Sequence, residues 1–345
     1  MKLQEVIGYL KKYDGPEMKL MEVCGTHTAS IFKHGIRSLI SPKIKLISGP
    51  GCPVCVTPTA YIDKCIEYAM KEDHVLLTFG DMMKVPGTEG SLSDMKGKGA
   101  DVELMYSPFE AVAKARDNPS VTYVVAAVGF ETTAPSYALM MEQAMREGTG
   151  NIRLVTALKT VIPALTWICE NQPDIDAFLC PGHVSVIIGS QPYEALAQAY
   201  GKPFVVAGFE AEHILAAIYE IVRQLNQEQA VVKNLYTNAV RPNGNSKALA
   251  VLSQYFEPGP AMWRGLGIIP DSGLYLKDTA YDGGSKGLVQ DMELPEGCRC
   301  GQVIVGKINP DQCPMFRTSC SPMKPFGPCM VSAEGACGIW YRNNY

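Results

Sequence analysis

The chain has twelve cysteines in 345 residues, and one close pair is Cys52-Pro53-Val54-Cys55. An apolar run, Ile44 to Ile47, precedes the pair and predicts a buried strand, and Thr59 to Lys71 after it predicts a helix. Unpaired backbone N–H groups at a helix start favour a thiolate and lower the pKa of a cysteine. The spacing therefore predicts an acidified thiol pair suited to metal binding or redox chemistry.

A second group of cysteines lies near the C-terminus, where six of the twelve fall within about forty residues. Four of them are separated by 14, 6 and 16 residues, and two more are interleaved: Cys298, Cys313, Cys320 and Cys337, with Cys300 and Cys329 between them. Wide spacing without close Cys-x-x-Cys knuckles fits a zinc ribbon poorly and suits an iron–sulfur cube. Zinc and buried or disulfide-bonded thiols remain alternatives.

Composition restricts the kind of protein. Apolar residues make up 47% and charged residues 19% of the chain, which is typical of a globular protein with a packed core. The net charge is −4 and no basic block is present, so we do not expect nucleic-acid binding. No apolar run approaches the ~20 residues of a membrane helix, and the N-terminus has no signal-peptide core. We expect a cytoplasmic protein without a membrane span, in which disulfide frameworks are rare.

Strand and helix patterns alternate from about residue 18 to residue 233, which predicts βαβ units around parallel sheets and an α/β fold. In open α/β sheets, sites form where strands end and helices begin. Several polar residues and cysteines share that placement: Cys24, Cys52, Asp81, Glu131, His183 and Glu210. From about residue 234 the helical periodicity fades and Gly, Pro and Cys increase, with turn-rich stretches such as Glu257 to Pro260. We expect a metal to stabilise this last region.

The sequence resembles a known protein family. The resemblance rests on five motifs in order: Cys24 to Thr28, Gly49 to Pro58, Thr78 to Met83, Gly129 to Pro135, and the four widely spaced C-terminal cysteines. Together they are similar to HypD, the maturation factors of [NiFe]-hydrogenase. One departure is Ala29-Ser30, where many members have His-Ala, so His27 is the only histidine in its motif.

The resemblance implies a fold and a domain plan. Two Rossmann-like parallel-sheet domains would face a cleft, and an irregular C-terminal domain would hold a [4Fe–4S] cluster. We place the boundaries at 1–17 (an N-terminal helix packing on the C-terminal domain), 18–120 (domain I, with Cys24 and the Cys52/Cys55 pair), 121–233 (domain II) and 234–345 (the iron–sulfur domain).

The resemblance also implies a function. With a HypC-type small chaperone, the chain would form the scaffold on which Fe(CN)2(CO) is built, receiving cyanide from a HypE-type donor. The finished group would pass to the hydrogenase large subunit. The family pattern assigns the cluster ligands to Cys298, Cys313, Cys320 and Cys337. It leaves Cys300 and Cys329 as a redox pair beside the cluster.

The iron that accepts cyanide needs soft, anionic ligands, and Cys24 is the best candidate because it ends a strand and begins a helix. A buried core thiol is the alternative. His27 can share a helical face with Cys24 and could bind iron, donate a proton or orient a ligand, or it could be structural. Cys52 and Cys55 could hold iron, or could deliver two electrons and close to a disulfide. We hypothesise that the cluster reduces the Cys300–Cys329 pair, which then reduces the Cys52–Cys55 pair.

The remaining polar residues at strand ends have two interpretations each. Asp81, Glu131 and Glu210 could bind iron transiently, contact cyanide or a partner, or simply cap helices; His183 could line the cleft. Two other functions compete with the scaffold: an iron–sulfur-dependent thiol–disulfide oxidoreductase, and a zinc-stabilised interaction protein.

Overall fold

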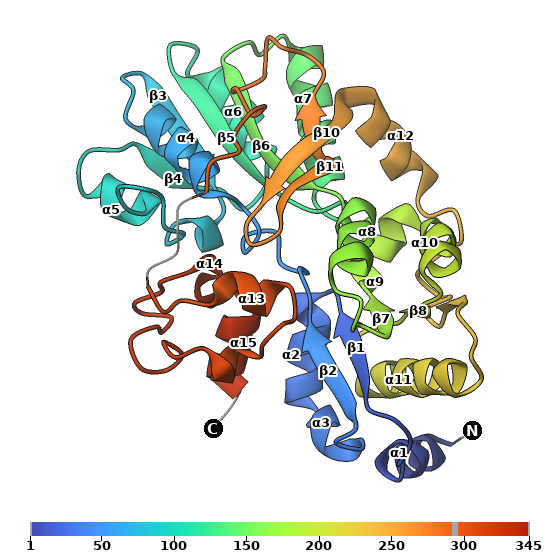
Figure 1. The fold of residues 1–345 in the computed structure, drawn as a ribbon. Coiled ribbons are helices and arrows are strands. Elements are labelled where there is room, and N and C mark those ends of the chain that lie inside the picture. Colours follow the sequence, from blue (N-terminus) through green and yellow to red (C-terminus); the bar gives the residue numbers. More distant parts are fainter. Residues whose placement is uncertain (1, 292–295, 344–345) are drawn as a thin grey trace.

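The computed structural model describes residues 2–291 and 296–343, and these form two β-sheets (Figure 1). A five-stranded parallel sheet has the order β2-β1-β7-β8-β9, and a six-stranded sheet has the order β10-β11-β6-β5-β3-β4. The first comprises β1 (Met18–Glu22), β2 (Ile44–Ser48), β7 (Ala177–Cys180), β8 (Phe204–Val206) and β9 (Val232–Asn234). The second comprises β3 (His74–Thr78), β4 (Val102–Leu104), β5 (Thr122–Gly129), β6 (Ile152–Lys159), β10 (Phe256–Trp263) and β11 (Gly267–Leu276).

Helices cover both faces of each sheet, because successive side chains of a strand point to opposite faces and both sets are apolar. In β1, Leu20 packs in an outer core and Met21 in a central core. The outer face of the five-stranded sheet carries α1 (Leu3–Lys11), α2 (Gly25–Lys33), α3 (Ile36–Leu39) and α11 (Ala211–Asn226). The outer face of the six-stranded sheet carries α6 (Glu110–Asp117), α7 (Ala134–Glu147) and α12 (Ser246–Tyr255).

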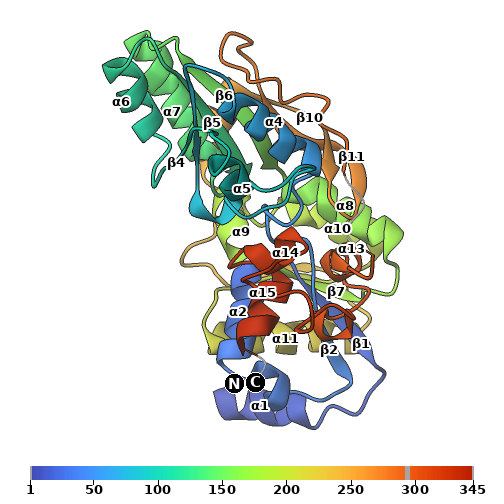
Figure 2. The ribbon, with the colours of Figure 1, turned by 90° about the vertical axis from the view of Figure 1, so that its left-hand side faces the viewer.

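The central core joins the two sheets to the cysteine-rich segments. It includes α4 (Thr59–Ala69), α5 (Leu92–Lys96), α8 (Val161–Asn171), α9 (Gly182–Ile188) and α10 (Pro192–Tyr200). Cys52, Cys55, Cys300, Cys329 and Cys337 belong to the same core. The C-terminal segment adds α13 (Cys300–Ile304), the 3₁₀ helix η2 (Pro310–Gln312), α14 (Pro328–Val331) and α15 (Ala336–Asn343). Of these, α15 lies beside α2 (Figure 2).

The predicted α/β class with parallel sheets is confirmed. The sheets, however, do not follow the ranges 18–120 and 121–233. Strands β1 and β2 pair with β7 to β9, whereas β3 and β4 pair with β5 and β6, so each sheet takes strands from both ranges. Periodicity identifies a strand, but it contains no information on which distant strand becomes its neighbour.

Part of the predicted irregular domain is a β-hairpin. Strands β10 and β11 pair antiparallel, and β11 pairs with β6, which extends the six-stranded sheet. The stretch Glu257 to Pro260, predicted to be a turn, lies within β10, and the register shifts between Gly259 and Ala261. Proline is compatible with this position because β10 is an edge strand with a bulge.

Two helices also differ from expectation. The N-terminal helix α1 packs against α11 instead of the C-terminal domain: the rings of Tyr9 and Tyr219 are 5.1 Å apart, and Asn226 donates a hydrogen bond to the Tyr9 hydroxyl. The segment 87–99 is rich in Gly and Ser, which favours a surface loop, but it contains α5, which begins at a Ser91–Asp94 capping box. Among the described residues, no helix has both the length and the apolar character that a membrane crossing needs.

Candidate functional site

Cys24 lies at the junction between β1 and α2, as the N-cap residue of the helix. Its side chain is buried, and the backbone N–H groups of Thr26 and His27 lie near enough to the sulfur to favour its thiolate. Burial nevertheless raises the pKa of the Cys24 thiol to about 11, and these N–H groups offset that only in part. At Cys24, burial therefore disfavours the thiolate more than the helix N-terminus stabilises it.

Two glycines let three chain segments meet at Cys24. Gly51, in the loop that carries the Cys52–Cys55 pair, lies so close that a Cβ there would be 2.6 Å from the backbone nitrogen of Cys24. On the other side of Cys24, a Cβ on Gly25 would collide with the backbone carbonyl of Glu334 in the C-terminal segment. Glycine is therefore required at both positions for the segments to approach.

A Gly25→Ala substitution should cost about 1–3 kcal/mol in the free energy of unfolding, because the added methyl meets rigid backbone. Gly8→Ala is the matched control, since a Cβ on Gly8 meets nothing within 4 Å and alanine favours the helix by about 0.5–1 kcal/mol. Denaturant unfolding measures both. Equal stability of the two variants would show that Gly25 does not hold the segments together.

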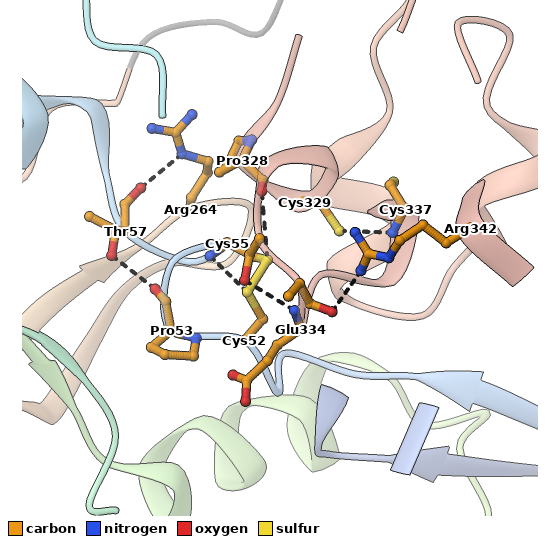
Figure 3. Close-up of a disulfide and its surroundings, with 12 residues drawn as sticks. Cys52, Pro53, Cys55, Thr57, Arg264, Pro328, Cys329, Glu334, Cys337 and Arg342 are labelled. Atoms are coloured by element: carbon orange, nitrogen blue, oxygen red, sulfur yellow. Dashed lines mark hydrogen bonds between the residues drawn. A yellow bond between two sulfur atoms is a disulfide. The ribbon is translucent and has the colours of Figure 1, made fainter. Parts of the chain in front are cut away.

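Cys52 and Cys55 form a disulfide in the loop between β2 and α4 (Figure 3). The backbone N–H of Cys55 donates to Sγ of Cys52 over 3.2 Å, and both side chains are buried. On the far side of the disulfide, Sγ of Cys55 lies 4.0 Å from the carbonyl oxygen of Pro328, the residue before Cys329. The loop is thus directly apposed to the start of α14.

One cavity connects this disulfide to the C-terminal cysteines. Its walls include Cys52, Cys55 and Cys329, together with Thr28 of α2 and Glu334. Figure 3 shows Glu334 beside Cys52, and Cys329 on the side of the disulfide where Cys337 also lies. The structure therefore brings the first thiol pair next to one member of the second predicted pair.

All six C-terminal cysteines line a second cavity: Cys298, Cys300, Cys313, Cys320, Cys329 and Cys337. Within it, the side chain of Cys329 is in hydrogen-bond contact with those of Cys300 and Cys337, and its Sγ accepts the backbone N–H of Cys337 over 3.3 Å. Burial raises the pKa of Cys298 to about 12. In the described ranges, no three His, Cys, Asp or Glu side chains are grouped so that they could hold one metal ion.

His27 is fully buried, and its ring contacts the loop after β8. Its Nε2 is 3.1 Å from the carbonyl oxygen of Gly208, so this nitrogen carries the proton and donates. The ring packs at a tilt against Phe209, with centroids 4.7 Å apart, and burial lowers the pKa of His27 to about 4. Nδ1 has no hydrogen-bond partner within the described part of the chain. These contacts make His27 a neutral link between α2 and the β8–α11 loop.

Acidification should test this description of His27. In the unfolded chain the imidazole has a pKa near 6.5, whereas in the folded protein burial keeps the ring neutral down to about pH 4. The contribution of neutral His27 to the free energy of unfolding is therefore complete above about pH 6.5 and is lost as the pH falls toward about 4. We expect a loss of about 3 kcal/mol in the free energy of unfolding over this window. In His27→Gln this part of the pH dependence should disappear, whereas exposed His34→Gln should retain it. Urea unfolding at several pH values measures the difference; identical slopes for His27→Gln and the parent would contradict the assignment.

The other predicted residues are more scattered. Glu131 is buried, its Oε1 accepts the backbone N–H of Val161 at the start of α8, and burial raises its pKa to about 7. Its Oε2 has no hydrogen-bond partner among the described residues. Asp81 and Glu210 are exposed, and the exposed ring of His183 packs at a tilt against Phe209 with centroids 4.1 Å apart.

Sequence reasoning missed two residues that border the thiol loop, Glu334 and Arg264. Glu334 contacts Gly25 through its backbone and faces the cavity beside Cys52. The buried guanidinium of Arg264 donates to the carbonyl of Thr57, two residues after Cys55. Neither residue stands in a pattern with chemical meaning, so no signal in the sequence marks them.

Comparison with known proteins agrees with this arrangement of motifs. A family model described as "HypD: Hydrogenase formation hypA family" matches residues 2–344. The chain is 43% identical over 333 residues to the "Hydrogenase maturation factor HypD" of Rhodobacter capsulatus, covering 94% of this chain and 88% of that protein. It is 40% identical over 347 residues to the protein of the same name from Escherichia coli K12, covering 99% and 93%. The corresponding figures for the Azotobacter vinelandii protein are 41% over 337 residues, 94% and 89%.

Proposed function

The chain belongs to the HypD family, and on that basis we propose that it is a hydrogenase maturation factor. Together with a HypC-type small chaperone it forms the scaffold for the Fe(CN)2(CO) group, receives cyanide from a HypE-type donor, and passes the group on for the hydrogenase large subunit. The observation that supports the proposal is that these cysteines lie together. Gly51 of the Cys52–Cys55 loop packs against the backbone of Cys24, and Cys52, Cys55 and Cys329 line one cavity.

Iron is the cargo of this scaffold, and thiolates suit it because they are soft, anionic ligands. Cys24 is the proposed main ligand, with Cys52 and Cys55 as further ligands when reduced. Because burial raises the pKa of Cys24, the thiol is protonated near neutral pH, so iron binding must release that proton. The N–H groups of Thr26 and His27 then stabilise the thiolate that is left.

The cavity lined by six cysteines fits a [4Fe–4S] cluster better than a single ion. A single ion needs all its sulfurs about 2.3 Å from one point, whereas each corner of a cube takes its own cysteine, which tolerates a wider ring of thiols. We assign the corners to Cys298, Cys313, Cys320 and Cys337, and Cys300 and Cys329 remain free. When bound, the cluster supplies electrons one at a time at low potential.

In the proposed thiol chemistry, the reduced Cys52/Cys55 pair supplies two electrons. A thiocyanate R–S–CN and the reduced Cys52/Cys55 dithiol give R–S⁻, CN⁻, two protons and the Cys52–Cys55 disulfide. To reset the pair, the Cys329 thiolate attacks Sγ of Cys55 and Cys52 leaves as a thiolate. Cys300 then attacks Sγ of Cys329, which releases Cys55 and leaves a Cys300–Cys329 disulfide.

A Cys300→Ser variant tests the reset directly. It should keep its cluster absorbance, because Cys300 is not a proposed ligand, but recovery of the Cys52 thiol after addition of a low-potential reductant should fall at least about tenfold. Trapping free thiols with an alkylating agent, followed by peptide mass spectrometry, measures recovery. Cys65→Ser, a buried thiol in α4, is the control. Unchanged recovery in Cys300→Ser would refute the exchange step.

The second candidate function is a thiol–disulfide oxidoreductase that builds no iron group. It is favoured by the disulfide of Cys52 and Cys55 and by the cavity they share with Cys329. Such a protein would use the same exchange, but it would need no buried ligand such as Cys24. The two functions therefore differ in whether iron with cyanide and CO is found on the protein.

A further inference from the structure

Arg264 is a buried cation at the centre of the contacts around the thiol loop, and its side chain is only 1% exposed. It lies in the turn between β10 and β11, which reaches from the six-stranded sheet toward the C-terminal segment (Figure 1). A buried guanidinium is costly unless its donors are used. Its contacts therefore indicate what it holds.

Three hydrogen bonds join Arg264 to the residues that follow Cys55. Its backbone N–H donates to the carbonyl of Val56 over 2.9 Å, Nε donates to the carbonyl of Thr57 over 2.9 Å, and Nη2 donates to the hydroxyl of Thr59 over 3.0 Å. The planar fork of an arginine can hold two such acceptors at fixed spacing, which a lysine cannot. The end of the Cys52–Cys55 loop is thus fixed from Val56 to the start of α4.

The counterion belongs to the same network. Asp291 Oδ1 lies 3.4 Å from Nη2 of Arg264 and accepts both the backbone N–H and the hydroxyl of Thr59. Nη1 of Arg264 has no hydrogen-bond partner in the described part of the chain, although the guanidinium is close enough to the Cys300 thiol to interact with it electrostatically.

The same turn also touches the helix that carries Cys300. Gly265 has a φ of +82°, and a Cβ there would be 2.8 Å from the Cα of Gly301. Only glycine adopts this backbone readily and allows so close an approach. One turn therefore contacts the Cys55 loop on one side and α13 on the other, while Cys55 Sγ lies 4.0 Å from the carbonyl before Cys329.

We infer that Arg264 is a positioning residue for thiol exchange: it holds the loop that carries Cys55 at the place where Cys329 can attack it. The inference rests on the exchange step of the proposed function and adds the residue that sets its geometry. A displacement of about 1 Å can slow a positioned reaction by about 100-fold, so the effect of losing Arg264 should fall on the reaction between the two cysteines.

The experiment uses the full chain with Cys52→Ser and Cys300→Ser, so that Cys55 and Cys329 can form a trapped disulfide. Diamide oxidation followed by peptide mass spectrometry gives the rate of Cys55–Cys329 cross-linking. The rate at which iodoacetamide alkylates Cys55 in the same protein gives its intrinsic reactivity. Arg264→Met, combined with Asp291→Asn to avoid an unpaired buried carboxylate, should slow cross-linking about 100-fold without slowing alkylation.

A matched control and a conservative variant complete the design. Arg223→Met breaks an ion pair with Glu220 on α11 and should leave both rates unchanged. Arg264→Lys keeps the positive charge but loses the planar guanidinium, so its cross-linking rate should lie between those of the Arg264→Met variant and the Arg223→Met control. It replaces the Arg264→Met variant if that variant does not fold. Cross-linking within about twofold of the control in the Arg264 variants would overturn the inference while leaving the exchange step intact. Absence of the cross-link when Arg264 is unaltered would overturn both.

Discussion

Replacing Cys24 with serine is expected to abolish hydrogenase maturation, lowering hydrogenase activity by more than about 100-fold in cells that depend on this chain. Serine nearly matches cysteine in shape and can accept the same N–H groups of Thr26 and His27, so the fold should persist. A hydroxyl is a hard, weakly acidic ligand, however, and cannot replace a thiolate on iron that carries cyanide. Hydrogenase activity in complemented cells measures the loss.

Cys65→Ser is the matched control for Cys24→Ser, because it also removes a buried thiol but lies in α4 within the central core. It should retain nearly full activity at equal protein level. Comparable activity of the two variants would mean that Cys24 is a core thiol, which was the alternative interpretation of its position.

Replacing Cys320 with alanine should remove the iron–sulfur cluster and unfold much of the C-terminal segment. The segment from 298 to 343 has only short helices, and its largest apolar anchors, such as Trp340, pack against α2. If the proposed cluster is bound there, its binding free energy contributes much of the segment's stability. We expect loss of the broad absorbance at the visible–UV edge, loss of nearly all bound iron, and faster proteolysis of this segment.

Cys169→Ala separates this effect from general loss of a thiol, since Cys169 is in α8, far along the chain from the C-terminal cysteines. Metal analysis of the anaerobically purified protein tests the cluster itself. Zinc in place of iron, bound equally by the parent and Cys169→Ala, would contradict the cluster and support the zinc-stabilised alternative.

The two glycines at Cys24 show how far sequence can lead to the site. Cys24, Gly25 and Gly51 stand in motifs that draw attention, and their placement at strand ends follows from local periodicity. That Gly51 touches Cys24 and Gly25 touches Glu334 depends on tertiary packing between segments up to about 300 residues apart. Local pattern has no access to such contacts.

The pKa of Cys24 shows a second limit. A helix N-terminus can be predicted from sequence, and it does favour a thiolate. How strongly burial raises the pKa depends on the segments that pack over the thiol, and at Cys24 burial is the larger effect. The prediction for the segment that forms β10 and β11 was wrong for a similar reason. Its Pro and Gly residues favour turns locally, but β11 pairs with β6, a contact that depends on tertiary structure.

Arg264 lies entirely beyond sequence reasoning, since a single arginine is most often a surface residue. Only the structure places its donors on Thr57 and Thr59. The division of the cysteines into two groups could be predicted more easily, because their spacing in the sequence distinguishes the close Cys52–Cys55 pair from the widely spaced C-terminal set.

The most direct test of the account is the infrared spectrum of the chain purified anaerobically together with a HypC-type small chaperone, its proposed partner. The scaffold function predicts cyanide and CO stretching bands in the complex, and it predicts that they vanish in Cys24→Ser and persist in Cys65→Ser. A complex that is loaded with iron and supports hydrogenase maturation but shows neither band, or bands that survive unchanged in Cys24→Ser, would contradict the claim that this site builds the iron group on Cys24.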